Sequence, residues 1–264
     1  MIPKIIFIIP YRNREYDKIR FSVYMNYLLE DYNKNDYEIY FSHQCDNRPF
    51  NRGATKNIGF LVAKEKYPND YKNITFVFND IDNLPIVKNK INYETKINEI
   101  NHIYGFKFAL GGIFSIKGID FEKCDGFPNN WGWGLEDNTI NDRALNRGLI
   151  INRNNLNIIG SKNIMHFSDS KMRIVNDKDA HNFLKKNIND NLSNITELTY
   201  EIIKNNENTN IELINQYIIN INTFETLKKY DLKDFFMRDV TLNNKIQGRQ
   251  KNNNLKNMNK FFKF

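Results

Sequence analysis

The sequence predicts an α/β protein with a mainly parallel central sheet. Short β-rich apolar runs alternate with segments that carry apolar residues at helical spacing, a pattern typical of parallel sheets covered by helices. Polar stretches follow the runs at 4–9 and 74–78, where such sheets bind ligands beyond the carboxyl ends of their strands. With 264 residues, 41% hydrophobic and 14% aromatic, the composition excludes a disordered polyelectrolyte.

The predicted elements follow one another in a regular order. The run KIIFII at 4–9 predicts a strand ending at Pro10, and residues 19–29 predict the first helix. Residues 37–41, 54–67 and 74–78 then predict a strand, a helix and a buried strand. We further expect a helix at 136–147 ended by Gly148, short strands within 149–167, a helix at 177–188, irregular structure with some strand at 191–222, and a poorly ordered end at 241–260.

Glycine and tryptophan gather in one region of the chain. Seven of the 12 glycines and both tryptophans lie between residues 105 and 134. Backbone freedom beside large aromatic surfaces predicts a mobile loop that closes on a ligand. The alternative is a set of tight turns around a core.

The net charge of +7 is unevenly distributed. Residues 223–264 hold ten Lys and Arg against four acids, a net +6, which leaves +1 for residues 1–222. We therefore expect one domain at 1–222 and a basic, Asn/Lys-rich tail at 223–264 that is partly helical or disordered. The tail carries no nucleic-acid-binding signature, so it is expected to dock on an acidic surface or to be inert.

Apolar runs and cysteines favour a cytoplasmic location. The longest clean apolar run, 5–9, is far shorter than the roughly 20 residues of a membrane span, and is too short for a signal-peptide core. Neither a transmembrane segment nor a signal peptide is therefore expected. Cys45 and Cys124 cannot form a disulfide scaffold, and no Cys/His cluster with zinc spacing surrounds them.

The stretch FVFNDIDNLP places two carboxylates at the exit of a buried strand. Asp80 and Asp82 lie two residues apart, so in extended geometry both point to one side. Carboxylate oxygens suit Mg²⁺ or Mn²⁺, which complete their shells with substrate phosphates. The alternative is a pair of solvated loop acids. His166, in the strand-like segment NIMHF, offers an imidazole to such an ion or has a purely structural role.

The run GFPNNWGWGLED combines two indoles with a carboxylate pair at a predicted helix start. The first-turn amides favour the ionised forms of Glu136 and Asp137, as a carboxylate that accepts a proton requires. Trp131 and Trp133 offer faces that stack on sugars or bases, the alternative being two core tryptophans. PYRNR at 10–14 and FNR at 50–52 each place Arg and Asn near a strand end, as bidentate phosphate donors or as solvated loop residues.

Taken together, these segments resemble the β-1,4-galactosyltransferase family. The family pattern is met in order by IIPYRNR (8–14), FNRGATKNIGF (50–60), FVFNDIDNLP (76–85), the glycine pair 111–112, GFPNNWGWGLED (126–137) and a histidine near HFSDS (166–170). The resemblance spans about residues 4–200. It implies a GT-A fold with a Rossmann-like sugar-nucleotide domain, and transfer of a hexose from a UDP-sugar with inversion, assisted by Mn²⁺.

The resemblance also implies roles for individual residues. The donor site would be lined by Pro10, Tyr11, Arg12, Asn13, Arg14, Phe50, Arg52, Asp80, Ile81, Asp82, Ala109, Gly112 and Trp133. Trp133 matches the flap tryptophan, and Asp82 with His166 would bind the metal ion. Leu135, Glu136, Asp137 and Asn138 fall at the acceptor site, and Asp137 matches the catalytic base.

Several positions depart from the family pattern. Asn163 stands where a methionine ligand is usual, so Asn163, Met165 or water would complete the metal shell, and Mg²⁺ becomes an alternative to Mn²⁺. Leu135 replaces a flap glycine, which implies a stiffer flap. Ala109 replaces a tyrosine that restricts the donor sugar, so UDP-GalNAc and UDP-GlcNAc become candidate donors beside UDP-Gal.

The sequence therefore predicts a metal-dependent inverting glycosyltransferase acting on a glycan or glycosylated acceptor. Asp137 would deprotonate the acceptor hydroxyl, while the ion at Asp82 and Arg12 or Arg14 would neutralise the departing UDP. The alternatives are an enzyme like the polypeptide or polysaccharide GalNAc-transferases, and a non-catalytic module that binds a glycan or UDP.

Overall fold

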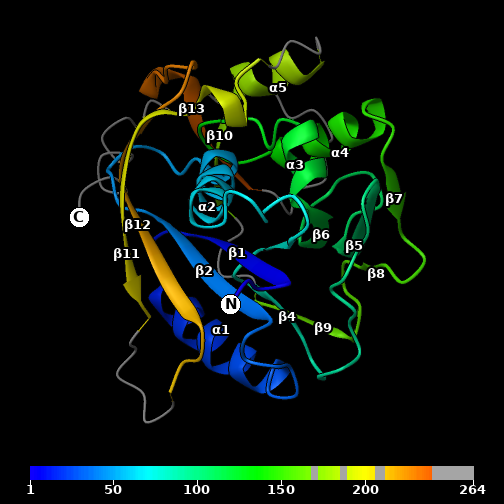
Figure 1. Cartoon of the computed structure of the whole chain (residues 1–264). Helices are drawn as coiled ribbons and strands as arrows, with labels where there is room; N and C mark the ends of the chain where they lie inside the picture. The colour runs from blue at the N-terminus through cyan, green and yellow to red at the C-terminus, as the bar shows by residue number, and fades with distance from the viewer. Residues whose placement is uncertain (168–171, 185–188, 206–211, 240–264) are drawn as a thin grey trace.

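The computed structural model describes residues 1–167, 172–184, 189–205 and 212–239, and Figure 1 shows their arrangement. A central sheet is covered by helices on both faces, with α1 (Glu15–Leu28) on one face and α2 (Arg52–Lys66) on the other. The α/β fold expected from the sequence is confirmed.

Strand β1 (Ile5–Tyr11) shows why both faces are covered. Its side chains alternate between the two faces. Ile6 and Ile8 pack in the core beneath α2, whereas Ile5, Phe7 and Ile9 pack in the core beneath α1. Every residue of the strand is buried, as expected for the centre of a parallel sheet.

The strand order creates a crevice at the carboxyl end of β1. Strands β2 (Tyr37–Gln44) and β3 (Thr75–Asn79) pair with β1 in parallel on its two sides. The chain therefore passes first to one side of β1 and then to the other, and ligands bind at such a reversal. The loops that follow β1 and β3, residues 12–14 and 80–82, flank this point.

The rest of the central sheet is mixed. Its order is β11-β12-β2-β1-β3-β6-β5-β7, with β8 also paired to β5. β6 is antiparallel to β3 and β5, and β11 is antiparallel to β12. The bounds are β5 (Glu99–Gly105), β6 (Ile113–Lys117), β7 (Ile150–Asn152), β8 (Asn157–Ile158), β11 (Thr196–Lys204) and β12 (Gln216–Glu225).

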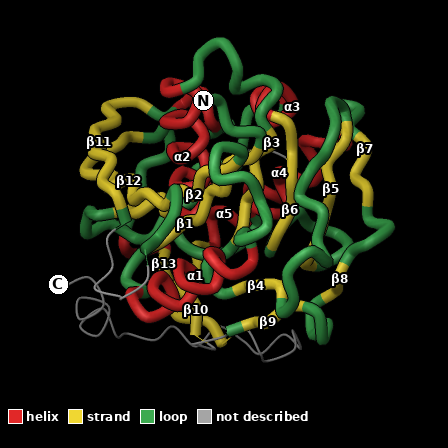
Figure 2. Tube along the Cα trace, turned by 60° about the horizontal axis from the view of Figure 1, so that its bottom comes forward, coloured by secondary structure: helices red, strands yellow, loops and turns green. Residues whose placement is uncertain are grey.

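Two small antiparallel sheets lie outside the central one, in the lower part of Figure 2. One joins β4 (Asn83–Pro85) to β9 (Ile164–His166), and the other joins β10 (Met172–Asn176) to β13 (Phe235–Asp239). The remaining elements are α3 (Gly118–Lys123), α4 (Glu136–Asn146), α5 (Asp177–Leu184) and the short helices η1 (Leu192–Asn194) and η2 (Leu232–Asp234). Residues 185–188 of the helix expected at 177–188, and the end expected to be poorly ordered, lie outside the described residues.

Two regions differ from the sequence-based expectations. Residues 191–222, expected to be mostly irregular, form β11 and most of β12, because β12 pairs with the distant β2. Residues 105–134 contain β6 and α3, with glycines in several left-handed turns, so tight turns around a core describe most of that region.

The boundary expected at residue 222 falls within β12. Phe224 and Phe235 are buried in the main core, and β13 pairs with β10. The described part of 223–264 therefore packs with the preceding domain, and 240–264 lie outside the description.

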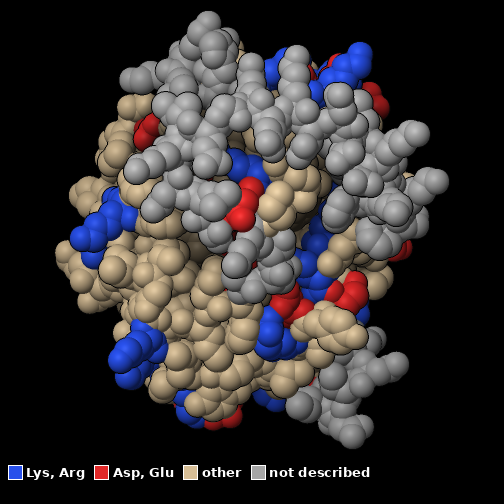
Figure 3. All heavy atoms as spheres, turned by 180° about the vertical axis from the view of Figure 1, so that it is seen from behind, with Lys and Arg blue, Asp and Glu red and all other residues tan. Residues whose placement is uncertain are grey.

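Charge on the described surface is mixed in sign. On the face in Figure 3, basic and acidic side chains lie next to one another, in line with the net +1 of residues 1–222. Among the described helices, none has the length and apolar character needed to span a bilayer.

Candidate active site

The loops after β1 and β3 are joined by an ion pair. Arg14 Nη1 lies 3.0 Å from Asp82 Oδ2, and Arg14 Nη2 donates to the Phe167 carbonyl at 3.5 Å. The Phe167 amide in turn donates to the Asp82 carbonyl at 2.8 Å. These contacts bring the PYRNR loop, the Asp80–Asp82 loop and the end of β9 together at the crevice.

Asp82 and His166, the residues that would hold a divalent cation, lie at neighbouring positions. His166 lies opposite Asn83 in the β4–β9 ladder, and Asn83 directly follows Asp82 in the chain. His166 Nδ1 lies 2.5 Å from Asn83 Oδ1, so Nε2 is the ring nitrogen that would bind a cation. A carboxylate oxygen and an imidazole nitrogen fit Mn²⁺.

The described residues hold no group of three or more His, Cys, Asp and Glu arranged for a metal ion. Asn163 Nδ2 donates to Asn157 Oδ1 at 3.0 Å, and Met165 packs against the core beneath α1. Neither of these two contacts involves Asp82 or His166. Substrate phosphates and water would therefore complete the shell, as is common for Mg²⁺-type sites.

Asp80 and Asp82 stand in opposite electrostatic environments. Burial and the neighbouring Asp80 raise the pKa of Asp82, although Arg14 acts against them. Burial also acts to raise the pKa of Asp80, but the charges of Lys56 and Arg52 outweigh it and hold that pKa below its usual range. A cation at Asp82 would relieve the repulsion between the two carboxylates.

Helix α2 directs two cations at the acidic residues of α4. Asn51 caps α2 by accepting from the Ala54 amide at 2.9 Å, and Arg52 and Lys56 follow four residues apart on one face. Arg52 Nη1 lies 3.5 Å from Glu136 Oε1. The side chain of Lys56 is only 2% exposed, and its Nζ lies 3.3 Å from both Asp80 Oδ1 and Asp137 Oδ1.

Burial brings the pKa of the Asp137 carboxyl close to neutrality. Burial, together with the charges of Glu136 and Asp80, raises the pKa of Asp137 to about 7, although Lys56 and Arg52 oppose the shift. The helix N-terminus was expected to favour the ionised form, yet the loss of solvent outweighs it. A carboxylate with such a pKa is suited to accept a proton near pH 7.

The glycine pair 111–112 lets the β5–β6 loop pass close to Asp137. A Cβ on Gly111 would lie 2.4 Å from Asp137 Oδ2, and one on Gly112, where φ is +70°, would lie 2.5 Å from the Tyr104 carbonyl oxygen. The Leu110 amide donates to the Asp137 carbonyl and the Asp80 amide to the Gly112 carbonyl, both at 2.9 Å. The glycines thus connect the Asp80–Asp82 loop to the start of α4.

The two tryptophans occupy different environments. Trp131 is 2% exposed and stacks on Phe224 with ring centroids 5.5 Å apart, so it is a core residue, and a ligand-stacking role for its ring is wrong. The sequence pattern did not reveal this because Phe224 is distant in the chain. Trp133 is 40% exposed, and Leu135, two residues further along the chain, has a left-handed φ of +70°. This leaves Trp133 alone as the flap candidate.

The other predicted residues lie at the end of β1, in the segments after β1, β2, β3 and β5, and in the first turn of α4. Tyr11 is the last residue of β1, and its hydroxyl donates a hydrogen bond to the Glu15 carboxylate. The Arg12 guanidinium donates a hydrogen bond to the Arg48 carbonyl. The guanidinium carbon of Arg52 lies 5.2 Å from the centre of the Phe50 ring. The remaining positions are Pro10 at the end of β1, Asn13 with a φ of +51°, buried Ile81, buried Ala109, and Asn138 in the first turn of α4.

Lys56 is the site residue that the sequence reasoning missed. Gly53, Lys56 and Phe60 fall at helical spacing, and all three are buried. That spacing would have placed a lysine on the buried face of the helix expected at 54–67. A buried lysine requires an anionic partner, so this pattern was the available signal.

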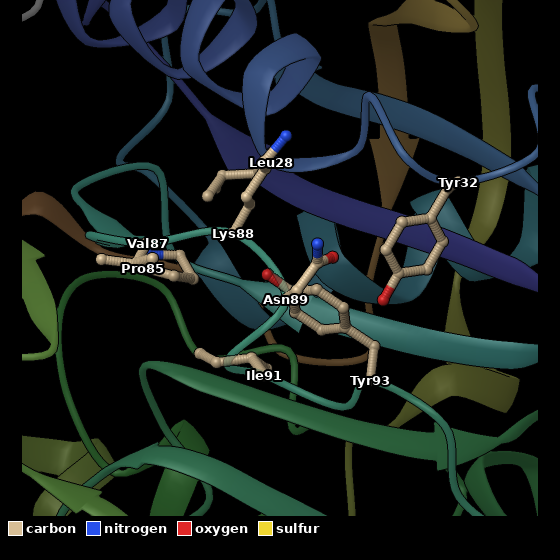
Figure 4. A pocket seen from close by; sticks show the side chains of 8 residues that line it. All are labelled: Leu28, Tyr32, Pro85, Val87, Lys88, Asn89, Ile91 and Tyr93. Carbon is tan, nitrogen blue, oxygen red and sulfur yellow. The ribbon is translucent and has the colours of Figure 1, made fainter.

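A second hollow lies between the end of α1 and the segment after β4 (Figure 4). Its lining is mostly apolar and tyrosine side chains, and its one charged residue is Lys88. Lys88 already pairs with Glu30 and Asp31. The hollow therefore lacks the charge that a nucleotide diphosphate requires.

Comparison with protein-family models identifies the N-terminal region of glycosyl transferase group 7 at residues 2–95, and the N-terminal domain of galactosyltransferase at 92–167. β-1,4-Galactosyltransferase 1 of Bos taurus is 31% identical over 214 residues, which are 75% of this chain and 51% of the relative. The Homo sapiens enzyme is 33% identical over 179 residues, 64% of this chain and 43% of the relative. The chain thus spans about half the length of these curated relatives.

Solved structures give the same fold. The catalytic domain of Drosophila β1,4-galactosyltransferase 7 in complex with xylobiose matches with a TM-score of 0.63 and 22% identity, covering 84% of this chain and 94% of that one. A mutant of that enzyme, in complex with manganese, UDP-Gal and xylobiose, matches with the same TM-score, 21% identity and the same coverage.

Proposed function

Because the chain belongs to the β-1,4-galactosyltransferase family, we propose that it is a metal-dependent inverting glycosyltransferase using a UDP-sugar donor and a glycan acceptor. One observation carries the proposal. An Arg14–Asp82–His166 cluster suited to a diphosphate and its cation lies close to Asp137, a partly buried carboxylate with a pKa of about 7.

The residues divide the chemistry between them. Asp137 accepts the proton of the acceptor hydroxyl, whose oxygen attacks the anomeric carbon as the bond to UDP breaks. Arg14 stabilises the negative charge on the departing diphosphate. When bound at Asp82 and His166, Mn²⁺ supplies Lewis-acid stabilisation of that diphosphate, with Mg²⁺ as the alternative ion. Trp133 covers the donor and limits access of water.

UDP-Gal is the first donor to test, and UDP-GalNAc and UDP-GlcNAc are the alternative donors. The complex of the Drosophila relative with UDP-Gal supports galactose. Ala109 supports the N-acetylhexosamines, because it is a small buried side chain two residues before Gly111, which contacts Asp137. The cytoplasmic location and a docking role for the basic tail stay predictions.

A donor screen with and without Mn²⁺ tests the proposal. UDP release from UDP-Gal, UDP-GalNAc and UDP-GlcNAc is measured with β-linked sugar acceptors, in metal and in EDTA. A transferase releases UDP only with metal and acceptor together. A binding module retains UDP affinity and releases none, and that outcome would refute the proposed activity.

A further inference from the structure

Lys56 occupies an unusual position within α2. Its side chain is almost entirely buried, and its Nζ lies 3.3 Å from one oxygen of Asp80 and 3.3 Å from one oxygen of Asp137. The two carboxylates come from different elements, the loop after β3 and the first turn of α4. Lys56 is therefore a direct link between them.

The lysine is held in place independently of those carboxylates. Its Nζ lies 4.8 Å from the centre of the Phe127 ring. The neighbouring Asn57 fixes the backbone of Phe127, since its side chain accepts from the Phe127 amide at 2.9 Å and donates to the Phe127 carbonyl at 2.8 Å. Burial and the contact with Phe127 restrict the ammonium group to a small region, so the carboxylates are positioned around it.

Lys56 contacts one oxygen of Asp137 and not the other. Lys56 binds Oδ1, whereas Oδ2 faces Gly111, where only a hydrogen stands. Oδ2 is thus the carboxylate oxygen that the lysine leaves available to accept a proton. The charge is also needed, since Asp80, Asp82, Glu136 and Asp137 are four carboxylates in one crevice.

We infer that Lys56 is a positioning residue for the transfer reaction, which orients the base Asp137 through Oδ1 and holds it at a fixed distance from Asp80. This inference rests on the proposed function, because it takes Asp137 as the base. Its consequence is specific: loss of Lys56 misplaces the base without removing any group that contacts the donor.

Lys56→Met tests the inference, because it keeps an unbranched side chain only one atom shorter than lysine and removes the ammonium. We expect kcat to fall on the order of 100-fold, as for a base displaced by about 1 Å. The donor KM and the UDP affinity measured by calorimetry should stay within about threefold of wild type. Lys64→Met is the matched control, since Lys64 lies on the same helix but pairs with Glu122 at the surface, and its kcat should not change.

Lys56→Arg keeps the charge and changes its position. Its kcat should lie about tenfold below wild type and above that of Lys56→Met. A wild-type kcat in either folded variant overturns the inference. A loss of kcat that is fully explained by a lower fraction of folded protein overturns it as well. If Lys56→Met does not fold, the Arg variant alone decides by the same criterion.

A carbon-13 NMR titration of the Asp137 carboxyl separates this inference from the proposed function. Asp137 is also faced by Glu136, Asp80 and Arg52, which both variants retain. Loss of the ammonium should move the midpoint upward by about one pH unit. That shift supports the contact even if no donor releases UDP, which would refute only the activity, and an unchanged midpoint overturns the role of Lys56.

Discussion

Gly111→Ala should impair catalysis by displacing the base, with little effect on stability or on UDP binding. The added Cβ would lie 2.4 Å from Asp137 Oδ2, whereas ordinary van der Waals contact begins at 3.4 Å, so the carboxylate must move by about 1 Å. The backbone of Gly111 is not left-handed, so alanine fits it without strain. We expect a loss of kcat on the order of 100-fold.

Stability should change little in the same variant. A glycine-to-alanine change at a compatible position stabilises by about 0.4–1 kcal/mol, which offsets part of the cost of moving Asp137. Thermal unfolding should therefore shift by only a few degrees, and UDP affinity by calorimetry should be retained. The kcat for UDP release is measured on the same preparations.

Gly148→Ala is the control at the other end of α4. No atom lies within 4 Å of its added Cβ, but φ is +75°, so it should lose about 1 kcal/mol of stability and keep its kcat. Adding Gly111→Ala to Asp137→Asn should cause no further loss of activity, because both act on one group. A Gly111→Ala enzyme with kcat within threefold of wild type would show that the space at Gly111 does not position Asp137.

Three further predictions concern the flap, the metal and the pH dependence. Trp131→Ala should cost about 3–5 kcal/mol in the free energy of unfolding, because Trp131 is a buried residue stacked on Phe224, whereas Trp133→Ala should reduce transfer with little effect on thermal stability. Asp82→Asn should weaken Mn²⁺ activation at least about tenfold in a metal titration of the rate, and an unchanged titration would contradict its role as a ligand. Asp137 has a pKa of about 7 in the fold against 3.8 as its ordinary value, so kcat/KM should fall below about pH 7. Because the folded state holds that proton more tightly, this carboxyl's contribution to stability should decrease as the pH rises from 3.8 to 7, and Asp137→Asn should remove that dependence in denaturant titrations.

The sequence predicts the first half of the fold well, because local patterns dominate there. The run at 4–9 corresponds to β1, and the helix expected at 54–67 to α2 at Arg52–Lys66. β1 is a continuous apolar run and α2 has apolar residues at helical spacing, and both lie in the centre of the molecule. The positions of Arg14 and Asp82 at one sheet edge follow from the same parallel arrangement.

Features that depend on distant partners were not predictable. Strand β11 is exposed along most of its length, so it has no alternating pattern, and its partner β12 is placed by pairing with β2. Trp131 is a core residue only because Phe224 covers it. The pKa of Asp137 likewise depends on burial by several elements, whereas the sequence shows only the favourable helix start.

The most direct test of the central claim compares wild type with Asp137→Asn in a metal-dependent UDP release assay. Wild type should transfer sugar from a UDP-sugar to a glycan acceptor only when Mn²⁺ is present. Asp137→Asn should lose transfer by at least about 1000-fold while it binds UDP and Mn²⁺ as wild type does. Full turnover by Asp137→Asn would contradict the assignment of the base.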